Sequence, residues 1–131
     1  MKVVLDTNVI VAGFGTRGLC EDVVRVSLSR HELFLSEPIL AEVSENLASK
    51  FKLPLTRVRE IITLLRELAQ VVVPIEVPTD ACRDVKDLVI LGTAIAANAD
   101  CLVSGDADLL VVGVYRGIRI ITPREFHDFI E

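Results

Sequence analysis

Short runs of apolar residues alternate along the chain with longer segments in which apolar and polar residues are mixed. The runs are nearly continuous in Val, Leu and Ile, which is typical of strands that are covered on both faces. Arg119 interrupts the last run, so we expect this strand at an edge of the sheet. The predicted strands are Met1–Leu5, His31–Leu35, Val71–Pro74, Cys101–Ser104 and Ile118–Ile121.

The mixed segments carry apolar residues three and four positions apart, which is the spacing of one helix face. Ser36 and Pro38 are residue types that are typical of a helix start. The predicted helices cover residues 19–29, 36–50, 55–70, 87–99 and 122–129, with a short helical turn at 108–112. Short apolar strands in alternation with helices indicate an α/β protein with a mostly parallel sheet.

Length and composition narrow the class of protein. The 131 residues suit one domain with a sizeable core, and no repeat or linker divides them, so we expect a single domain over residues 1–131. A composition of 51% hydrophobic and 25% charged residues excludes a disordered chain. No apolar stretch is long enough to span a membrane, and the first residues are not arranged as a signal peptide.

Cysteine usage and net charge indicate the compartment and the partners. Cys20, Cys82 and Cys101 are widely separated and odd in number, which argues against a disulfide framework or a zinc site and for the reducing cytoplasm. The formal net charge of −5 counts mildly against a nucleic acid partner, because phosphate contacts normally come from Lys and Arg. A nucleic acid fits this charge only if the positive charge is local or is supplied by cations.

The densest basic stretch lies at the junction of two predicted helices. Its members either guide a nucleic acid backbone or form the solvated surface of that junction, and the sequence does not favour the first role over the second. They are Lys50, Lys52, Arg57 and Arg59.

Acidic residues follow two of the predicted strands. Asp6 comes directly after the run at residues 1–5, and Asp106 comes shortly after the run at 101–104. In open parallel sheets, ligands bind in the crevice outside the carboxyl ends of the strands. If both strands are central and parallel, the carboxylates of Asp6 and Asp106 point into the same crevice.

Local structure alone offers another explanation for each acid. For Asp6, a place in a turn and a functional role explain the sequence equally well. Asp108 is more readily explained as a helix cap. Asp84 and Asp87 have the spacing of a capping box, although a carboxylate at a helix start can also bind a metal. Glu42 lies off the centre of its apolar stripe, where an ordinary solvated glutamate would also lie.

The acids are more informative as a set than singly. They come from distant segments, and none has an obvious basic partner nearby in sequence. Converging carboxylates raise one another's pKa values unless a cation neutralises them. Oxygen ligands favour Mg²⁺ or Mn²⁺ over zinc, because His31 and His127 are isolated and are expected on the surface.

Three motifs, taken together and in this order, resemble those of the PIN-domain ribonucleases. They read VVLDTNVIV at residues 3–11, SEPILAEV at 36–43 and RDVKDLVILGTAIAANADCLVSGDADLL at 83–110. The resemblance covers essentially the whole chain and is greatest to the small prokaryotic, VapC-like toxins of toxin–antitoxin pairs. It implies a three-layer α-β-α sandwich with a mostly parallel central sheet.

By position, the resemblance also implies a set of site residues. The acidic site, which holds the metal and carries catalysis, falls on Asp6, Glu42, Asp87 and Asp106. The supporting polar positions fall on Thr7, Asn8, Ser104 and Asp108. Asp87 is preferred to Asp84 because its distance to Thr93 fits the family pattern. Leu88 departs from the pattern, since many relatives have a polar residue there, and Ser104 stands where relatives usually have Thr.

The function that the resemblance implies is a metal-dependent endoribonuclease. One or two Mg²⁺ or Mn²⁺ ions would lower the pKa of a bound water and neutralise charge in the transition state, with Glu42 as a ligand or a water-orienting base. An RNA substrate, a cognate antitoxin protein and self-association as a dimer or larger oligomer are implied in the same way.

Two other functions remain open at the level of the sequence. A PIN fold that binds RNA but cleaves it weakly is kept open by Leu88. A Mg²⁺-binding signalling receiver belongs to a different class, and it would need paired acids at the first strand and a Lys after a late strand. The chain has a DTN motif at the first strand and only Arg119 in the last one, so the receiver fits less well.

Overall fold

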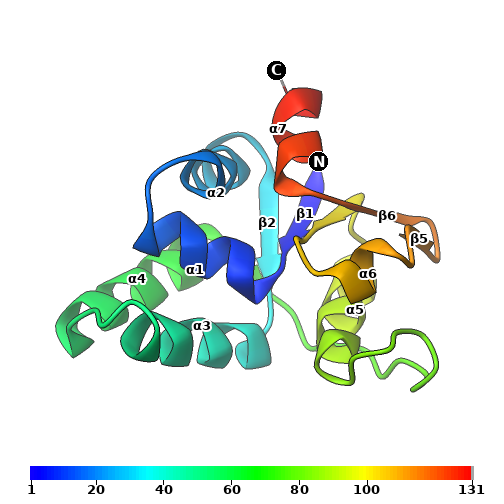
Figure 1. Cartoon of the computed structure of the whole chain (residues 1–131), viewed down its shortest axis with the longest axis horizontal. Helices are drawn as coiled ribbons and strands as arrows, with labels where there is room; N and C mark the ends of the chain where they lie inside the picture. Colours follow the sequence, from blue (N-terminus) through cyan, green and yellow to red (C-terminus); the bar gives the residue numbers. More distant parts are fainter. Residues whose placement is uncertain (131) are drawn as a thin grey trace.

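A mostly parallel sheet lies between helices on its two sides in the computed structural model, which describes residues 1–130 (Figure 1). Among these residues the strand order is β3-β2-β1-β4-β6-β5. The strands are β1 (Lys2–Leu5), β2 (Glu32–Leu35), β3 (Gln70–Val71), β4 (Cys101–Val103), β5 (Val114–Tyr115) and β6 (Ile118–Ile121). The helices are α1 (Thr7–Gly15), α2 (Leu19–Arg30), α3 (Glu37–Ser49), α4 (Leu55–Leu68), α5 (Lys86–Ala96), α6 (Ala107–Leu110) and α7 (Pro123–Ile130).

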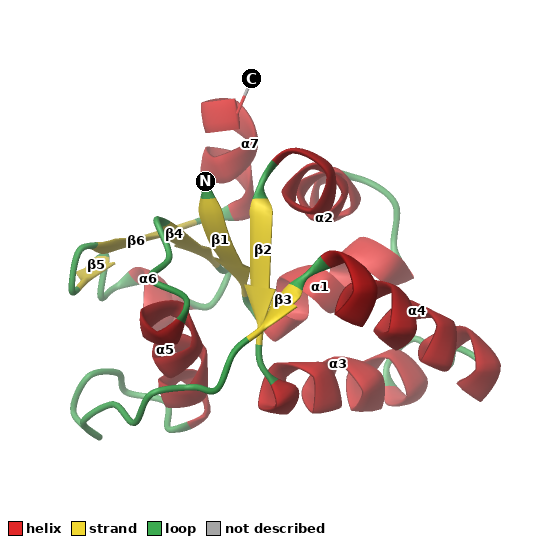
Figure 2. Ribbon diagram, turned by 180° about the vertical axis from the view of Figure 1, so that it is seen from behind, coloured by secondary structure: helices red, strands yellow, loops and turns green. Residues whose placement is uncertain are grey.

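The strands β1 and β4 form the centre of this sheet and run parallel. Leu5 pairs with Val103, and β2 pairs in parallel with the other side of β1. The apolar runs are continuous because helices cover both faces: α1 to α4 gather on one side and α5 on the other in both views (Figures 1 and 2). The expected α/β fold with a mostly parallel sheet is therefore confirmed, and the two central strands end at the same edge.

The helix α1 was not expected from the sequence. Its residues Val9, Ile10 and Val11 are all buried, so the segment is apolar without the three-and-four spacing of an amphipathic helix. Asp6 is the N-cap of α1, and Thr7 and Asn8 begin the helix. The prediction of a turn at these residues is therefore wrong.

Two further differences concern the borders of the sheet. The strand β5 was not predicted; it pairs antiparallel with β6, so β6 is not the edge that Arg119 indicated. β3 has only two residues. The segment that follows it, residues 72–78, crosses α5, where the Ile75 N–H donates to the Gly92 carbonyl at 3.0 Å.

Among the described residues, no helix combines the length and the apolar character that crossing a membrane requires.

The two histidines are less exposed than the sequence indicated. His31 packs edge-on against the ring of Phe126, with ring centroids 5.8 Å apart. His127 is half-buried, and its Nε2 lies 3.9 Å from Asp22 Oδ2. Both side chains are partly exposed, and neither lines the cavity between α3 and α5 that is described below.

Candidate active site

Asp6 and Ser104 are the first residues after the two central strands, so they lie side by side. The hydroxyl Oγ of Ser104 donates to Asp6 Oδ2 across 2.6 Å, and both side chains are buried. Burial raises the pKa of Asp6, the hydrogen bond from Ser104 lowers it, and the charge of Asp106 raises it again. Ser104 therefore orients the Asp6 carboxylate and opposes its protonation.

The same serine hydroxyl also positions Asp106. Its single proton is used on Asp6, and its oxygen accepts from the Asp106 N–H at 3.0 Å. Asp106 is the N-cap of α6, and its Oδ1 accepts from the Asp108 N–H at 2.8 Å. The cap of this turn is thus Asp106 and not Asp108, for which the sequence favoured that role. The other carboxylate oxygen of Asp106 is not used by the cap.

Asp87 lies in the first turn of α5 and is only 5% exposed. Burial raises its pKa to about 7, and the carboxyl group of Asp106 and the charges of Asp6 and Asp84 act in the same direction. Asp84 precedes the helix, and its Oδ1 accepts from the Lys86 N–H at 3.0 Å. The N-cap of α5 is Val85, so Asp84 and Asp87 do not form the capping box that their spacing allowed. Both belong to a group of carboxylates that repel one another.

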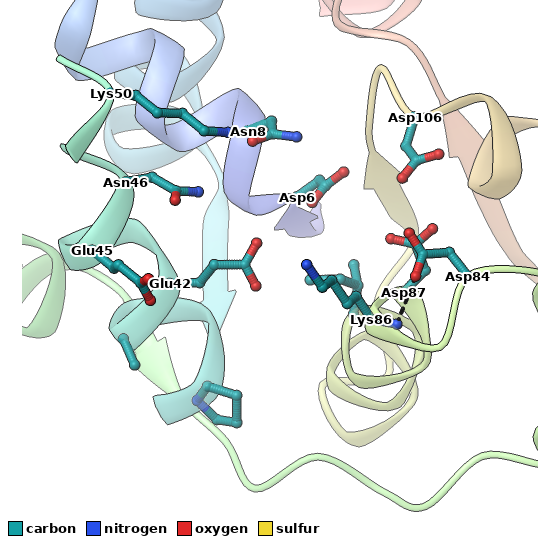
Figure 3. Close-up of a pocket in the computed structure, with 13 residues that line it drawn as sticks. Asp6, Asn8, Glu42, Glu45, Asn46, Lys50, Asp84, Lys86, Asp87 and Asp106 are labelled. Carbon is teal, nitrogen blue, oxygen red and sulfur yellow. Dashed lines mark hydrogen bonds between the residues drawn. The ribbon is translucent and has the colours of Figure 1, made fainter.

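A cavity of about 660 Å³ lies between α3 and α5 (Figure 3). Glu42 points into it from α3, Asp87 and Asp106 lie on the opposite side, and Asp6 lies between them. The lining residues are Asp6, Asn8, Pro38, Ala41, Glu42, Glu45, Asn46, Lys50, Asp84, Lys86, Asp87, Ile90 and Asp106. The four acids that the resemblance selected, together with Asn8, are therefore brought to one cavity.

Three supporting or neighbouring groups lie behind the cavity wall. Ser104 acts through Asp6, as described above. Thr7 is buried at the start of α1, and its Oγ1 has no hydrogen-bond partner within residues 1–130. Asp108 lies beside Asp84 and Asp87, and one carboxylate oxygen of each lies within 4.8 Å of the other two.

The structure divides the predicted basic stretch. Lys50 lines the cavity, whereas Lys52, Arg57 and Arg59 are not among the described residues that do. Arg57 instead lies 3.6 Å from Glu60 on the exposed surface of α4. Any contact of Lys52, Arg57 or Arg59 with a substrate would therefore take place outside the cavity.

The sequence analysis missed several residues that line or border the cavity. Glu45 and Asn46 lie one helical turn after Glu42, a spacing that would have placed all three on one face of α3. Lys86 precedes Asp87, and nothing in the sequence distinguishes it from a surface lysine. Cys82 is buried, with its Sγ 3.8 Å from Asp87 Oδ2.

The residues present fit a hard divalent cation. The groups that converge are carboxylates and amides, the oxygen donors that Mg²⁺ and Mn²⁺ prefer. Burial and the neighbouring carboxylates of Asp106, Asp6 and Asp84 raise the pKa of Asp87, so a cation bound beside it would favour its ionised form. Asp87 is common to two groups: it lies close to Asp84 and Asp108, and it interacts electrostatically with Asp106 and Asp6. Glu42 lies on the α3 side of the cavity.

Comparison with known families identifies the class of protein. A sequence model described as PIN domain matches residues 2–108, so the chain belongs to the PIN-domain family, whose members are typically nucleases. The resemblance found in the sequence is thereby confirmed. Among solved structures, the chain is similar to the crystal structure of VapBC2 from Rickettsia felis bound to a DNA fragment from their promoter.

The similarity to VapBC2 concerns the fold. The TM-score is 0.62 at 17% sequence identity, and the match covers 93% of this chain and 98% of the other. A comparison with curated proteins gives no match.

Proposed function

We propose that this protein is a divalent-metal-dependent endoribonuclease that hydrolyses phosphodiester bonds within RNA. The observation that carries the proposal is the meeting of Asp6, Glu42, Asp87 and Asp106 in one cavity at the carboxyl ends of β1 and β4. Membership of a family of nucleases supports it. The same membership argues against the signalling receiver that the sequence left open.

Each residue of the cavity has a distinct task in this proposal. Asp6, Asp87 and Asp106 would hold one or two Mg²⁺ or Mn²⁺ ions, and the hydrogen bond from Ser104 orients the Asp6 carboxylate and favours its ionised form. The bound cation supplies a water of lowered pKa and neutralises charge on the phosphate in the transition state. Glu42, from the facing helix, orients the attacking water or accepts its proton. Asn8 and Asn46 offer uncharged donors to the substrate.

An antitoxin partner is the second part of the proposal. The structural neighbour is a VapBC2 complex, and this similarity supports a VapC-like toxin that is neutralised by a cognate antitoxin. Self-association as a dimer or larger oligomer belongs to the same proposal. A cytoplasmic location also belongs to the proposal, and the free cysteines Cys20, Cys82 and Cys101 are compatible with a reducing compartment.

A PIN fold that binds RNA without cutting it is the remaining alternative. It rests on Leu88, where many relatives have a polar residue. Leu88 is half-buried, packs against the core and is not among the described residues that line the cavity. All four acids of the cavity are thus present despite the apolar residue at position 88, which favours the nuclease.

A cleavage assay tests the proposal. Metal-stripped protein is incubated with end-labelled RNA, and with DNA of the same sequence, before and after Mn²⁺ or Mg²⁺ is added. We expect cleavage of RNA by the wild type only with metal, and a loss of at least 100-fold in Asp6→Asn, because a metal ligand is removed. Asp80→Asn, which changes an exposed acid outside the cavity, is the control. Equal cleavage by wild type and Asp6→Asn would refute the site, and no cleavage by folded, metal-bound wild type would favour the binding module.

A further inference from the structure

Two lysines line the acidic cavity from its two sides. Lys50 stands at the C-terminal end of α3, and Lys86 lies in the first turn of α5 (Figure 3). Both are exposed. Within residues 1–130 neither ammonium group forms an ion pair at 4.0 Å or less, although acidic residues line the same cavity.

Lining the cavity sets the two lysines apart from the other Lys and Arg residues within 1–130. Arg25, Arg57 and Arg66 each pair with a carboxylate on the surface. Lys50 and Lys86 instead face a cavity in which a cation-bound phosphate would be held. A lysine ammonium is a compact point charge that binds phosphate. Their positions therefore suit contacts with the substrate better than contacts with the protein.

The helix α3 gives the cavity a long wall. The lining residues of this helix run from Pro38 to Lys50, which is about 18 Å at a rise of 1.5 Å per residue. Successive phosphates of one strand are about 3.4 Å apart along a duplex axis, so this wall is longer than one nucleotide step. Asn46 lies on the same wall between Glu42 and Lys50 and can donate to phosphate or sugar oxygens.

We propose that Lys86 and Lys50 bind backbone phosphates of the substrate, Lys86 at or next to the bond that is cut and Lys50 further along the strand. This inference rests on the proposed nuclease function and makes it more specific. The cavity takes an internal stretch of a strand with several phosphates and discriminates against mononucleotides and dinucleotides.

Equilibrium binding tests the inference apart from catalysis. The affinity for a fluorescein-labelled 12-nucleotide RNA is measured between 50 and 300 mM salt. Ca²⁺, a cation that also binds oxygen ligands, replaces Mn²⁺. Gel electrophoresis checks that the RNA stays intact. We expect Lys50→Gln and Lys86→Gln each to weaken binding about 3- to 10-fold and to reduce the salt slope by about 0.7, the value for one phosphate of a single strand. A labelled dinucleotide should bind far more weakly and show no effect of Lys50→Gln.

Two matched variants control for general charge. Arg30→Gln and Arg83→Gln each remove one exposed positive charge, and neither residue is among those described as lining the cavity. We expect both to change the affinity less than 2-fold and to keep the salt slope. The inference would be overturned if the control variants bound RNA as weakly as the tested variants. It would also be overturned if the wild type did not bind RNA.

The outcomes separate this inference from the proposed function. If Lys86→Gln changes only the Mn²⁺ affinity, measured by calorimetry, then Lys86 is a counter-ion of the acids, and the inference fails for that residue. If the wild type cleaves RNA with Mn²⁺ but neither substitution changes the salt dependence of RNA affinity, the inference fails and the proposed nuclease function stands. If both lysines affect the slope but no RNA is cut, the binding surface stands and the nuclease fails.

Discussion

The buried hydroxyl of Ser36 lies 2.8 Å from the buried hydroxyl of Thr93, and this hydrogen bond joins α3 to α5. Thr93 uses its own proton on the carbonyl of Val89 at 2.8 Å, so Ser36 is the donor. Ser36 occupies the N-cap of α3, but its side chain makes no cap hydrogen bond there. Because α3 carries Glu42 and α5 carries Asp87, the bond sets the spacing of two acids of the site.

Thr93→Val tests this connection. The variant keeps the volume of the side chain but leaves the buried Ser36 hydroxyl without its acceptor, so we expect a loss of about 1–3 kcal/mol in the free energy of unfolding, measured in urea. We also expect weaker Mn²⁺ binding, because the two helices are no longer tied. Thr93→Ser keeps the hydroxyl and should retain most of both properties. Unchanged stability in Thr93→Val would show that the bond contributes little.

Ser104→Ala removes the hydrogen bond that lowers the pKa of Asp6. The pKa of Asp6 then rises, and the acidic limb of the pH–rate profile should shift to higher pH. We expect kcat to fall about 10- to 100-fold near neutral pH, because Asp6 is both less ionised and less well oriented. Ser104→Thr retains the hydroxyl and should keep the wild-type profile. An identical profile for Ser104→Ala would refute the role of Ser104.

The stability of the metal-free protein should depend on pH through Asp87. Its pKa rises from 3.8 to about 7 on folding, so the folded state binds the proton more tightly than the unfolded state. The stabilisation from this group is therefore complete below about pH 4 and is lost as the pH rises through 7. We expect the Tm in EDTA to fall between pH 5 and 8, and to fall less in Asp87→Asn. Saturating Mn²⁺ should raise the Tm of the wild type at pH 8, where the carboxylates are ionised and repel one another.

Gly92→Ala should destabilise the protein, although alanine is the better helix former. A Cβ at this position would lie 2.2 Å from the carbonyl oxygen of Ile75, in the segment that crosses α5. The segment must therefore move, and we expect a loss of about 1–3 kcal/mol in urea denaturation. Gly105→Ala is the control, because a Cβ there meets no described atom within 4 Å. A Gly92→Ala protein that is more stable than the wild type would show that the segment adjusts freely.

The central sheet and the meeting of the acids followed from the sequence for a physical reason. Strands that are covered on both faces leave continuous apolar runs, and the carboxyl ends of parallel neighbours share an edge, so Asp6 and Asp106 could be placed together. Glu42 could not be placed in this way. Its position depends on how α3 packs beside α5, and only the family resemblance selected it.

The elements that the sequence did not reveal lack a local signal. The helix α1 is mostly apolar, and its central residues Val9, Ile10 and Val11 are consecutive and buried, so it shows no clear amphipathic period. β5 has two residues, too few to show any alternation. Lys86 looks like any lysine at the start of a helix, and its place in the cavity depends on contacts that form only in the folded chain.

The pairing of β1 with β4 has a consequence for the synthesis of the protein. The hydrogen bond between Ser104 and Asp6 joins positions 98 residues apart in the chain. A nascent chain that ends before residue 101 has no β4, so nothing holds Asp6 in its final place, and Asp106 has not yet been added. The acids therefore come together only after β4 and Asp106 have been made, and a product that ends before residue 101 lacks the assembled acidic cavity.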